Sequence, residues 1–377
     1  MPPRSVLLSL ASAYFVLGVS SLAVVGLVPP IANDLHVAPA SVALLVTAFA
    51  LTYAVVSPLS QMVIGHWERR SLILTGLGLM AAGLLGSGLA PDYPTLFVAR
   101  MVMAAGAVLI GPMASATAAS LSRPEERGAA LGAVFGGMTL ATVIGVPASG
   151  WMGSFVGWRE TMGVLAVVAV AAAVWVRLAV PGASRGQRSS LADMREILGD
   201  RIVASAIGVA MFQMAAQFAT YALIGAYLTE VFRMPASWVP LGLAIFGIGG
   251  VVGNAMASRL MLKVAPVRMV GIGLVALGAC MAAFLVAPPW AWLALLLMLL
   301  WAISGMSPIA AGQAWLLQLA PGNLVLALNA AAMYVGIAGG SALSGLTYTL
   351  AGAAALPLAS LLTVGIAGLC YRIARRG

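Results

Sequence analysis

Long apolar stretches follow one another along almost the whole chain, with polar residues gathered in short breaks between them. The apolar runs are continuous and do not alternate with polar positions, which favours helices over the strands of a membrane barrel. A helix that crosses a bilayer needs about 20 mostly apolar residues. The pattern predicts twelve such helices, near 5–30, 40–64, 71–90, 94–120, 128–152, 160–181, 201–230, 237–261, 267–287, 291–318, 324–350 and 354–373.

The most charged stretch of the chain, Ser184 to Asp200, divides these twelve runs into six and six. Transporters commonly contain such internal repeats and place their substrate between them. We therefore expect an all-α membrane protein of two pseudo-symmetric six-helix bundles. The expected boundaries are an N-terminal bundle over 1–182, a cytoplasmic connecting loop over 183–200 and a C-terminal bundle over 201–377.

Composition and charge agree with a membrane protein. The chain is 62% hydrophobic and 8% charged, whereas soluble proteins carry about 25% charged residues. Although the net charge is +9, the basic residues gather in the breaks on one side of the predicted bundle, and the other side receives only Arg159 and Arg233. The positive-inside rule then places both termini in the cytoplasm, and this pattern argues against nucleic-acid binding. Ala11-Ser12-Ala13 comes too early for a signal-peptide cleavage site, so the first helix is expected to remain uncleaved.

Polar side chains inside the predicted helices identify the segments that can line a cavity. In hydrocarbon such groups must face protein or water. Gln213, Gln217, Tyr221 and Gly225 recur every four residues and share one helix face. They form either a substrate-binding stripe or polar contacts that hold neighbouring helices together. The candidate substrate-binding residues are Tyr14, Tyr53, Met103, Gln213, Gln217, Tyr221, Asn254, Gln313 and Asn329.

The fifth predicted helix contains the segment Gly145-Val146-Pro147-Ala148-Ser149-Gly150. Small residues allow close helix packing and proline permits bending, so these residues form a hinge or simply a packing site. The longer segment from Phe135 to Gly163 resembles the major facilitator superfamily, in particular its drug:proton antiporter branch and the sugar-efflux group of arabinose-efflux-like permeases. The resemblance implies that Gly145, Pro147 and Gly150 are the hinge of an exporter.

Three further segments are similar to the same family: Pro29 to Leu35, Ala216 to Glu230 and Leu328 to Gly345. The loop after the second helix departs from the family pattern, because Gly65-His66 stands where an Asp-Arg pair is expected. Only Arg69 and Arg70 remain as candidates for the cytoplasmic gate. His66 and Glu68 either replace the missing acid or are solvated loop charges.

Arg100 lies within the fourth predicted helix and needs a partner, because an unpaired arginine at a helix centre costs about 2.5 to 3.5 kcal/mol on insertion scales. Asp34 is the acid best matched in depth, and we expect the two side chains to interact, directly or through water. The interaction serves either proton coupling or only the packing of the fourth predicted helix against the first. The family resemblance implies that Arg100 takes part in proton coupling. The candidate coupling residues are therefore Asp34, Arg100 and Glu230, although no carboxylate lies in the middle of a span.

The sequence thus predicts a secondary active exporter of a small, neutral or amphipathic molecule such as a drug, sugar or nucleoside, working by alternating access. Protons are the candidate coupling ion. The alternative is an importer or facilitator on the same fold. Cys280, Cys370, His36 and His66 show no metal-binding or catalytic spacing, so we expect no cofactor, no metal and no enzyme activity. We expect a monomer in the bacterial cytoplasmic (inner) membrane, with the lipid bilayer as its solvent and no nucleic-acid partner.

Overall fold

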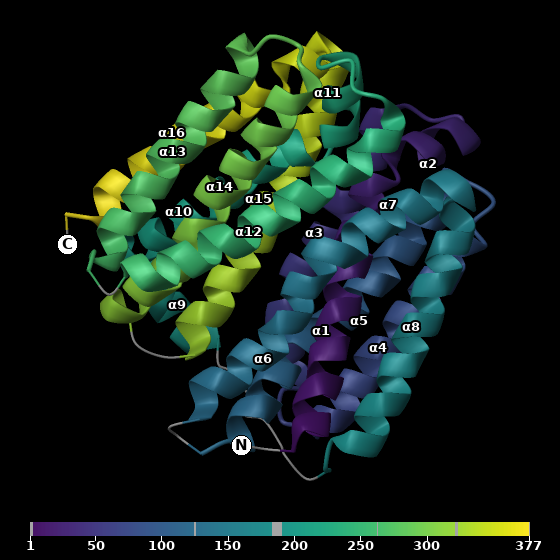
Figure 1. Cartoon of the computed structure of the whole chain (residues 1–377). Coiled ribbons are helices and arrows are strands. Elements are labelled where there is room, and N and C mark those ends of the chain that lie inside the picture. Colours follow the sequence, from purple (N-terminus) through teal and green to yellow (C-terminus); the bar gives the residue numbers. More distant parts are fainter. Residues whose placement is uncertain (1–2, 124–125, 183–190, 262, 321–322, 377) are drawn as a thin grey trace. The chain divides into compact units, whose positions relative to one another are not determined.

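The computed structural model describes residues 3–123, 126–182, 191–261, 263–320 and 323–376, which form helices and no strands (Figure 1). Within this part of the chain, twelve helical segments are long and apolar enough to cross a membrane. They lie where the apolar runs predict them, so the expected all-α fold with twelve spans is confirmed.

The chain divides into two compact units. The first comprises Met1–Val37 and Val55–Ser189, and the second comprises Ala38–Ala54 and Ser190–Gly377. The division near residue 190 agrees with the expected connecting loop, but the beginning of the second span groups with the second unit. The three-part division into 1–182, 183–200 and 201–377 therefore remains a proposal.

The helices up to the division follow the predicted spans closely. They are α1 (Arg4–Gly26), α2 (Val28–Asp34), α3 (Pro39–Val63), α4 (Arg69–Gly88), α5 (Tyr93–Ser120), α6 (Arg127–Leu140), the π-helical turn η2 (Ala141–Gly145), α7 (Val146–Phe155) and α8 (Trp158–Ala179). The fifth span runs through α6, η2 and α7.

The predicted loop over 183–200 contains a helix, α9 (Leu191–Gly199), whereas residues 183–190 lie outside the described part of the chain. The remaining elements are α10 (Arg201–Tyr221), α11 (Ile224–Glu230), η3 (Ala236–Trp238), α12 (Val239–Leu260), α13 (Pro266–Val286), α14 (Ala291–Leu319), α15 (Asn323–Ala351), η4 (Ala353–Ala355) and α16 (Leu356–Ala374). Within the second unit α13 lies beside α16 (Figure 1).

The first and seventh spans are each interrupted near one end. The helix that begins at Arg4 ends at Gly26, because Pro29 and Pro30 have no N–H to bond the preceding carbonyls, and Leu27 leaves helical geometry. The helix that begins at Arg201 ends at Tyr221, and the chain resumes as α11 after Leu223. Each break is followed by a seven-residue helix that ends on a carboxylate.

These parallels extend to other positions in the two units. Asp34 and Glu230 end α2 and α11 and are 196 residues apart, which is also the separation of Pro112 and Pro308 inside α5 and α14. Gly157 and Gly352, which precede α8 and η4, both adopt positive φ. Such matched placements are what an internal sequence repeat produces.

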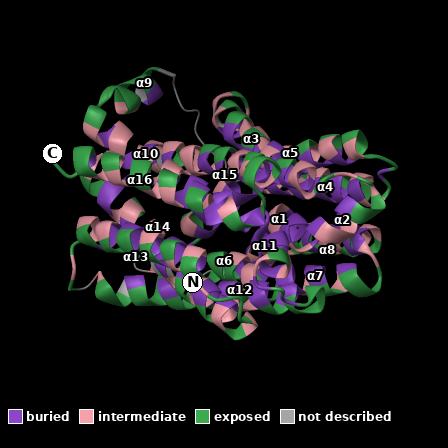
Figure 2. Ribbon diagram, turned by 90° about the horizontal axis from the view of Figure 1, so that it is seen from above, coloured by how far each residue is buried: buried purple, intermediate pink, exposed green. Residues whose placement is uncertain are grey.

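Burial changes from one face of a helix to the other (Figure 2). Large apolar side chains such as Phe155, Val275 and Leu350 are among the most exposed of the chain. In water such a surface would drive aggregation, but hydrocarbon solvates it. The exposed apolar surface is therefore expected to face lipid.

Candidate functional site

The helix face formed by Gln213, Gln217 and Tyr221 points into the second unit. All three side chains are buried, at 3%, 2% and 6% exposure. They therefore do not face lipid, and the face packs against α14, where Trp301, Gly305 and Pro308 lie.

Gln213 lines a narrow crevice. Its Nε2 donates a hydrogen bond of 2.8 Å to the carbonyl oxygen of Gly305. Gln313 and Asn329 line the same crevice, so three of the predicted substrate-binding residues meet there. The cavity volume is about 20 Å³, which is room for about one water molecule or one small functional group. The full lining is Ala206, Val209, Ala210, Gln213, Met214, Val270, Pro308, Ile309, Gly312, Gln313, Trp315, Asn329 and Met333.

Gln217 lies one turn further along α10 and outside the crevice lining. Its Oε1 accepts a hydrogen bond from Nε1 of Trp301, and its Nε2 is buried with no partner among the described residues. The carboxamide rests on Gly305, where an added Cβ would come within 2.6 Å of its Cδ. Gln217 is thus held by α14 and does not line the crevice.

Tyr221 belongs to an aromatic cluster. Its ring lies 4.6 Å from that of Phe246 and 6.0 Å from that of Trp301, measured between centroids, and Trp301 packs in turn on Phe284. Trp301 and Gly305 were not predicted as site residues. A tryptophan and a glycine within the same apolar span, close to Pro308, are the signal that could have indicated them.

The other predicted binding residues lie apart from the crevice. Tyr14 donates to the carbonyl of Gly111 at 2.8 Å and is hydrogen-bonded to Ser115, within the first unit. Tyr53 stacks on Tyr334 with ring centroids 3.7 Å apart. Asn254 is exposed on α12.

Arg100 is fully buried in the first unit beside Met103. Its Nη1 donates to the carbonyl of Ser20 at 2.6 Å and its Nη2 to the carbonyl of Ser21 at 3.0 Å. The guanidinium is therefore hydrogen-bonded to main-chain carbonyls of α1. A fork of two parallel donors is a geometry that arginine provides and lysine does not.

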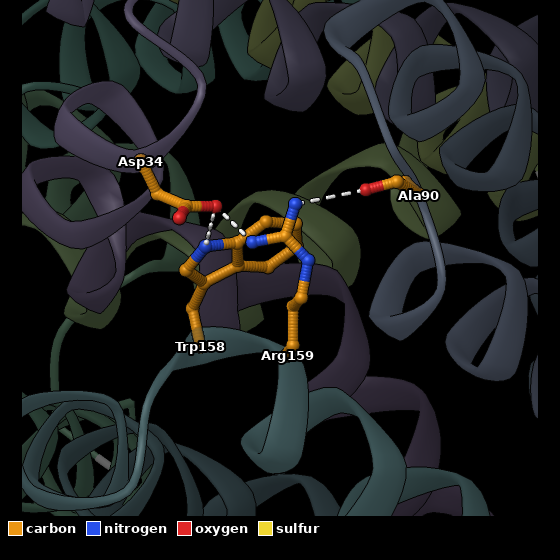
Figure 3. Close-up of polar contacts among 4 residues, drawn as sticks. All are labelled: Asp34, Ala90, Trp158 and Arg159. Carbon is orange, nitrogen blue, oxygen red and sulfur yellow. Dashed lines mark hydrogen bonds and ion pairs between the residues drawn. The ribbon is translucent and has the colours of Figure 1, made fainter.

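The expected interaction between Arg100 and Asp34 is wrong. Asp34 forms an ion pair with Arg159 and accepts a hydrogen bond of 3.1 Å from Nε1 of Trp158, while Arg159 also donates to the carbonyl of Ala90 (Figure 3). Asp34 ends α2, beyond the proline-induced break, and the start of α8 brings Trp158 and Arg159 to it. These hydrogen bonds, above all that from Arg159, lower the pKa of the Asp34 carboxyl.

Glu230 holds the matching place in the second unit. Its carboxylate accepts a hydrogen bond of 2.7 Å from the hydroxyl of Tyr348, near the end of α15. The acids that end α2 and α11 are thus each bonded to a later helix of the same unit.

The glycine and proline residues of the predicted hinge occur at a change of helix type. The π-helical turn η2 ends at Gly145, and Pro147 lies in the first turn of α7. Single π-turns and prolines are the usual causes of bends in helices. Gly145 lies against Phe15 and Val19 of α1, and Gly150 is buried. A hinge role for Gly145, Pro147 and Gly150 remains a proposal.

The predicted cytoplasmic gate residues tie the start of α4 to its neighbours in the first unit. Arg69 donates to the carbonyl of Ala116 at 3.2 Å, and Arg70 donates to that of Val180 at 3.3 Å. Glu68 forms an ion pair of 3.6 Å with Arg70 and accepts a hydrogen bond from Ser71. These contacts are with residues two and three positions along the chain, and a gate role for Glu68, Arg69 and Arg70 remains a proposal.

Among the described residues, no group of three or more histidine, cysteine or acidic side chains is placed to hold a metal ion. The chemistry that the candidate site offers is therefore hydrogen bonding by neutral amides beside aromatic and methionine side chains.

The sequence is similar to a known protein family and to several of its members. The model of the Major Facilitator Superfamily matches residues 10–325. The inner membrane transport protein YdhP of Escherichia coli (strain K12) is 28% identical over 254 residues, which are 67% of this chain and 65% of that protein. A chloramphenicol resistance protein of Streptomyces lividans is 32% identical over 257 residues, again 67% of this chain and 65% of that protein. The matched region thus spans just under two thirds of the length of these relatives.

Solved structures share the fold. The D-xylose-proton symporter superposes with a TM-score of 0.76 over 96% of both chains, at 15% sequence identity. At that identity the similarity shows the fold alone.

Proposed function

Because this chain belongs to the Major Facilitator Superfamily, whose fold is that of membrane transporters, we propose that it is a secondary active exporter. Its substrate would be a small, neutral or amphipathic molecule that leaves the cytoplasm by alternating access. The observation that carries this proposal is the crevice of the second unit. Gln213, Gln313 and Asn329 meet there without a charged side chain in the lining.

The relatives support the direction of transport. One of them is a chloramphenicol resistance protein, and resistance by a membrane transporter is most simply export. The fifth span contains a π-turn followed by Pro147, and the first and seventh spans are interrupted, so each unit has positions at which a helix can bend. Such points suit a protein that alternates between two facing states.

We propose protons as the coupling ion, with Asp34, Arg100 and Glu230 as the residues to test. Arg100 is the buried charge, and the two carboxylates hold equivalent positions at the ends of α2 and α11. Both acids already have hydrogen-bonding partners. Taking up a proton would therefore compete with those contacts.

Transport can be tested with inside-out membrane vesicles from an efflux-deficient bacterium, in which export appears as uptake. Radiolabelled chloramphenicol and a set of neutral sugars and nucleosides serve as probes, with vesicles lacking the protein as the control. We expect saturable uptake of at least one probe, abolished by an uncoupler. Saturable uptake into intact cells, with none into inside-out vesicles, would show an importer. No protein-dependent movement of any probe would reject the proposed substrate class.

A further inference from the structure

Two amide side chains of the crevice have their orientation fixed by their partners. A main-chain carbonyl can only accept a hydrogen bond, so Gln213 must direct its Nε2 to Gly305. The sulfur of Met333 can likewise only accept, and Nδ2 of Asn329 lies 3.7 Å from it. The amide nitrogens are therefore the atoms that the protein itself engages.

The atoms of these two amides with no protein partner among the described residues are two carbonyl oxygens, Oε1 of Gln213 and Oδ1 of Asn329. Both residues are almost fully buried, at 3% and 4% exposure. The buried part of the crevice consequently offers two free acceptor oxygens to a ligand.

The size and charge of the crevice restrict the group that can enter. A volume of about 20 Å³ admits a single small group, so the rest of the ligand must lie outside. An anionic group would meet two oxygen lone pairs. A cationic group would lose its hydration beside a lining that holds no acid. A neutral group that donates a hydrogen bond meets none of these costs.

We propose that this crevice is a subsite for a hydroxyl or amide N–H group of the exported molecule, which donates to Gln213 and Asn329. The inference rests on the proposed function and deepens it, because it names the chemical group that the protein recognises. Gln217 is then a positioning residue. It lies behind Gly305, the residue that orients Gln213, and is held there by Trp301.

The wall of the crevice supports a fixed shape. The ring of Pro308 packs directly on Gly273 of α13, where an added Cβ would come within 3.1 Å of two of its ring carbons and closer still to a third. The proline therefore has no space to withdraw toward α13. A rigid wall favours selection by size as well as by hydrogen bonding.

The subsite can be tested by equilibrium binding to the purified full-length protein in detergent, which does not depend on the direction of transport. The probes are chloramphenicol and a panel of neutral aryl alcohols, together with their methyl ethers and the corresponding carboxylates. We expect alcohols to bind several-fold to about tenfold more tightly than their ethers, as the loss of one hydrogen bond predicts. Carboxylates should bind more weakly than both.

Substitutions identify the acceptor. Gln213→Met keeps the volume but removes one of the two acceptor oxygens, so the alcohol-to-ether ratio should fall. Gln213→Glu should shift the preference toward aryl amines, because it adds the missing acid. The control is Gln318→Met, at an exposed glutamine of α14 outside the crevice, which should leave the ratio unchanged.

The outcomes separate the inference from the proposed function. If no alcohol is preferred over its ether, or if Gln213→Met leaves the preference unchanged, the subsite is wrong even where export is demonstrated. If alcohols are preferred and Gln213→Met lowers the preference while vesicles show no export, the subsite stands and the proposed export is wrong.

Discussion

The indole N–H of Trp301 donates a hydrogen bond to Oε1 of Gln217, and the opposite end of that carboxamide, Nε2, is buried with no acceptor among the described residues. An unsatisfied buried donor costs about 1 to 3 kcal/mol, whereas a satisfied hydrogen bond contributes only about 1 kcal/mol. The pair therefore contributes little net stability. It fixes which atom of Gln217 faces Trp301 and how α10 packs on α14.

Substituting Trp301→Phe should destabilise the protein for two reasons. The smaller ring leaves a cavity, and Oε1 of Gln217 loses its donor. Only the second cost depends on Gln217, so Trp301→Phe should cost about 1 to 3 kcal/mol less in a Gln217→Met background. Thermal or denaturant unfolding in detergent, arranged as a double-mutant cycle, measures this coupling.

The matched control for this cycle is Trp315→Phe. Trp315 lies on another part of α14 and packs on Tyr371 of α16. The loss of stability caused by Trp315→Phe should therefore be the same with Gln217 or Met at position 217. Equal costs for Trp301→Phe in the two backgrounds would show that leaving Oε1 of Gln217 without its donor does not destabilise the protein.

Gly305→Ala should disturb the crevice without changing any polar group. The new Cβ would come within 2.6 Å of Cδ and Oε1 of Gln217, so the amide or α14 must move, and Gln213 shares the same glycine through its hydrogen bond. We expect chloramphenicol affinity to fall by about tenfold and stability by about 1 to 3 kcal/mol. Gly365→Ala on α16, where the Cβ meets open space, is the control: it should leave the affinity unchanged and the stability unchanged or raised by up to about 1 kcal/mol.

The sequence predicts the spans and the polar face of α10 well, because both depend on local periodicity. Gln213, Gln217 and Tyr221 share a face for the same reason that any residues four apart do. Which of them lines a crevice depends on the neighbouring helix. The contacts with Trp301 and Gly305 of α14 determine it, and the spacing of residues along α10 does not predict those contacts.

The partner of Asp34 shows the same limit. Depth along the helices suggested Arg100, but the break at Leu27 turns the chain into α2, and α8 brings Arg159 to the carboxylate. Arg100 donates instead to main-chain carbonyls of α1. Because every residue has a main-chain carbonyl, no sequence pattern could have identified this partner. Prolines at positions 29 and 30 were the available signal for the break.

Neighbouring glycines in α6 should respond in opposite ways to alanine. Gly137 lies against the main chain of Ala11 in α1, where an added Cβ would collide with the carbonyl oxygen, whereas Gly136 faces open space. Gly137→Ala should therefore cost about 1 to 3 kcal/mol through overpacking. Gly136→Ala should be neutral or stabilise by up to about 1 kcal/mol, through its higher helix propensity.

Unfolding temperatures of the two purified variants test this prediction. The two substitutions add the same methyl group to adjacent residues, so each controls for the other. Equal stabilities would mean that α1 and α6 do not approach as closely as the structure shows.

Asp34 should make the stability of the first unit depend on pH on the acid side. Its pKa is lowered in the folded protein, chiefly by Arg159, with further contributions from Trp158 and His36. A carboxyl with a lowered pKa stabilises the fold above its ordinary value, near pH 4, and this contribution is lost as the pH falls through the folded pKa. Asp34→Asn should therefore weaken the loss of thermal stability between about pH 5 and pH 3.

Glu196→Gln, which removes an exposed carboxylate on α9 of the second unit, is the control and should leave the acid limb as in the unmodified protein. In proteoliposomes with an imposed pH gradient, Asp34→Asn should also abolish proton-driven transport, because the amide cannot exchange a proton. Undiminished transport by Asp34→Asn, with an altered acid limb of stability, would show that Asp34 fastens α2 to α8 but does not carry the coupling proton.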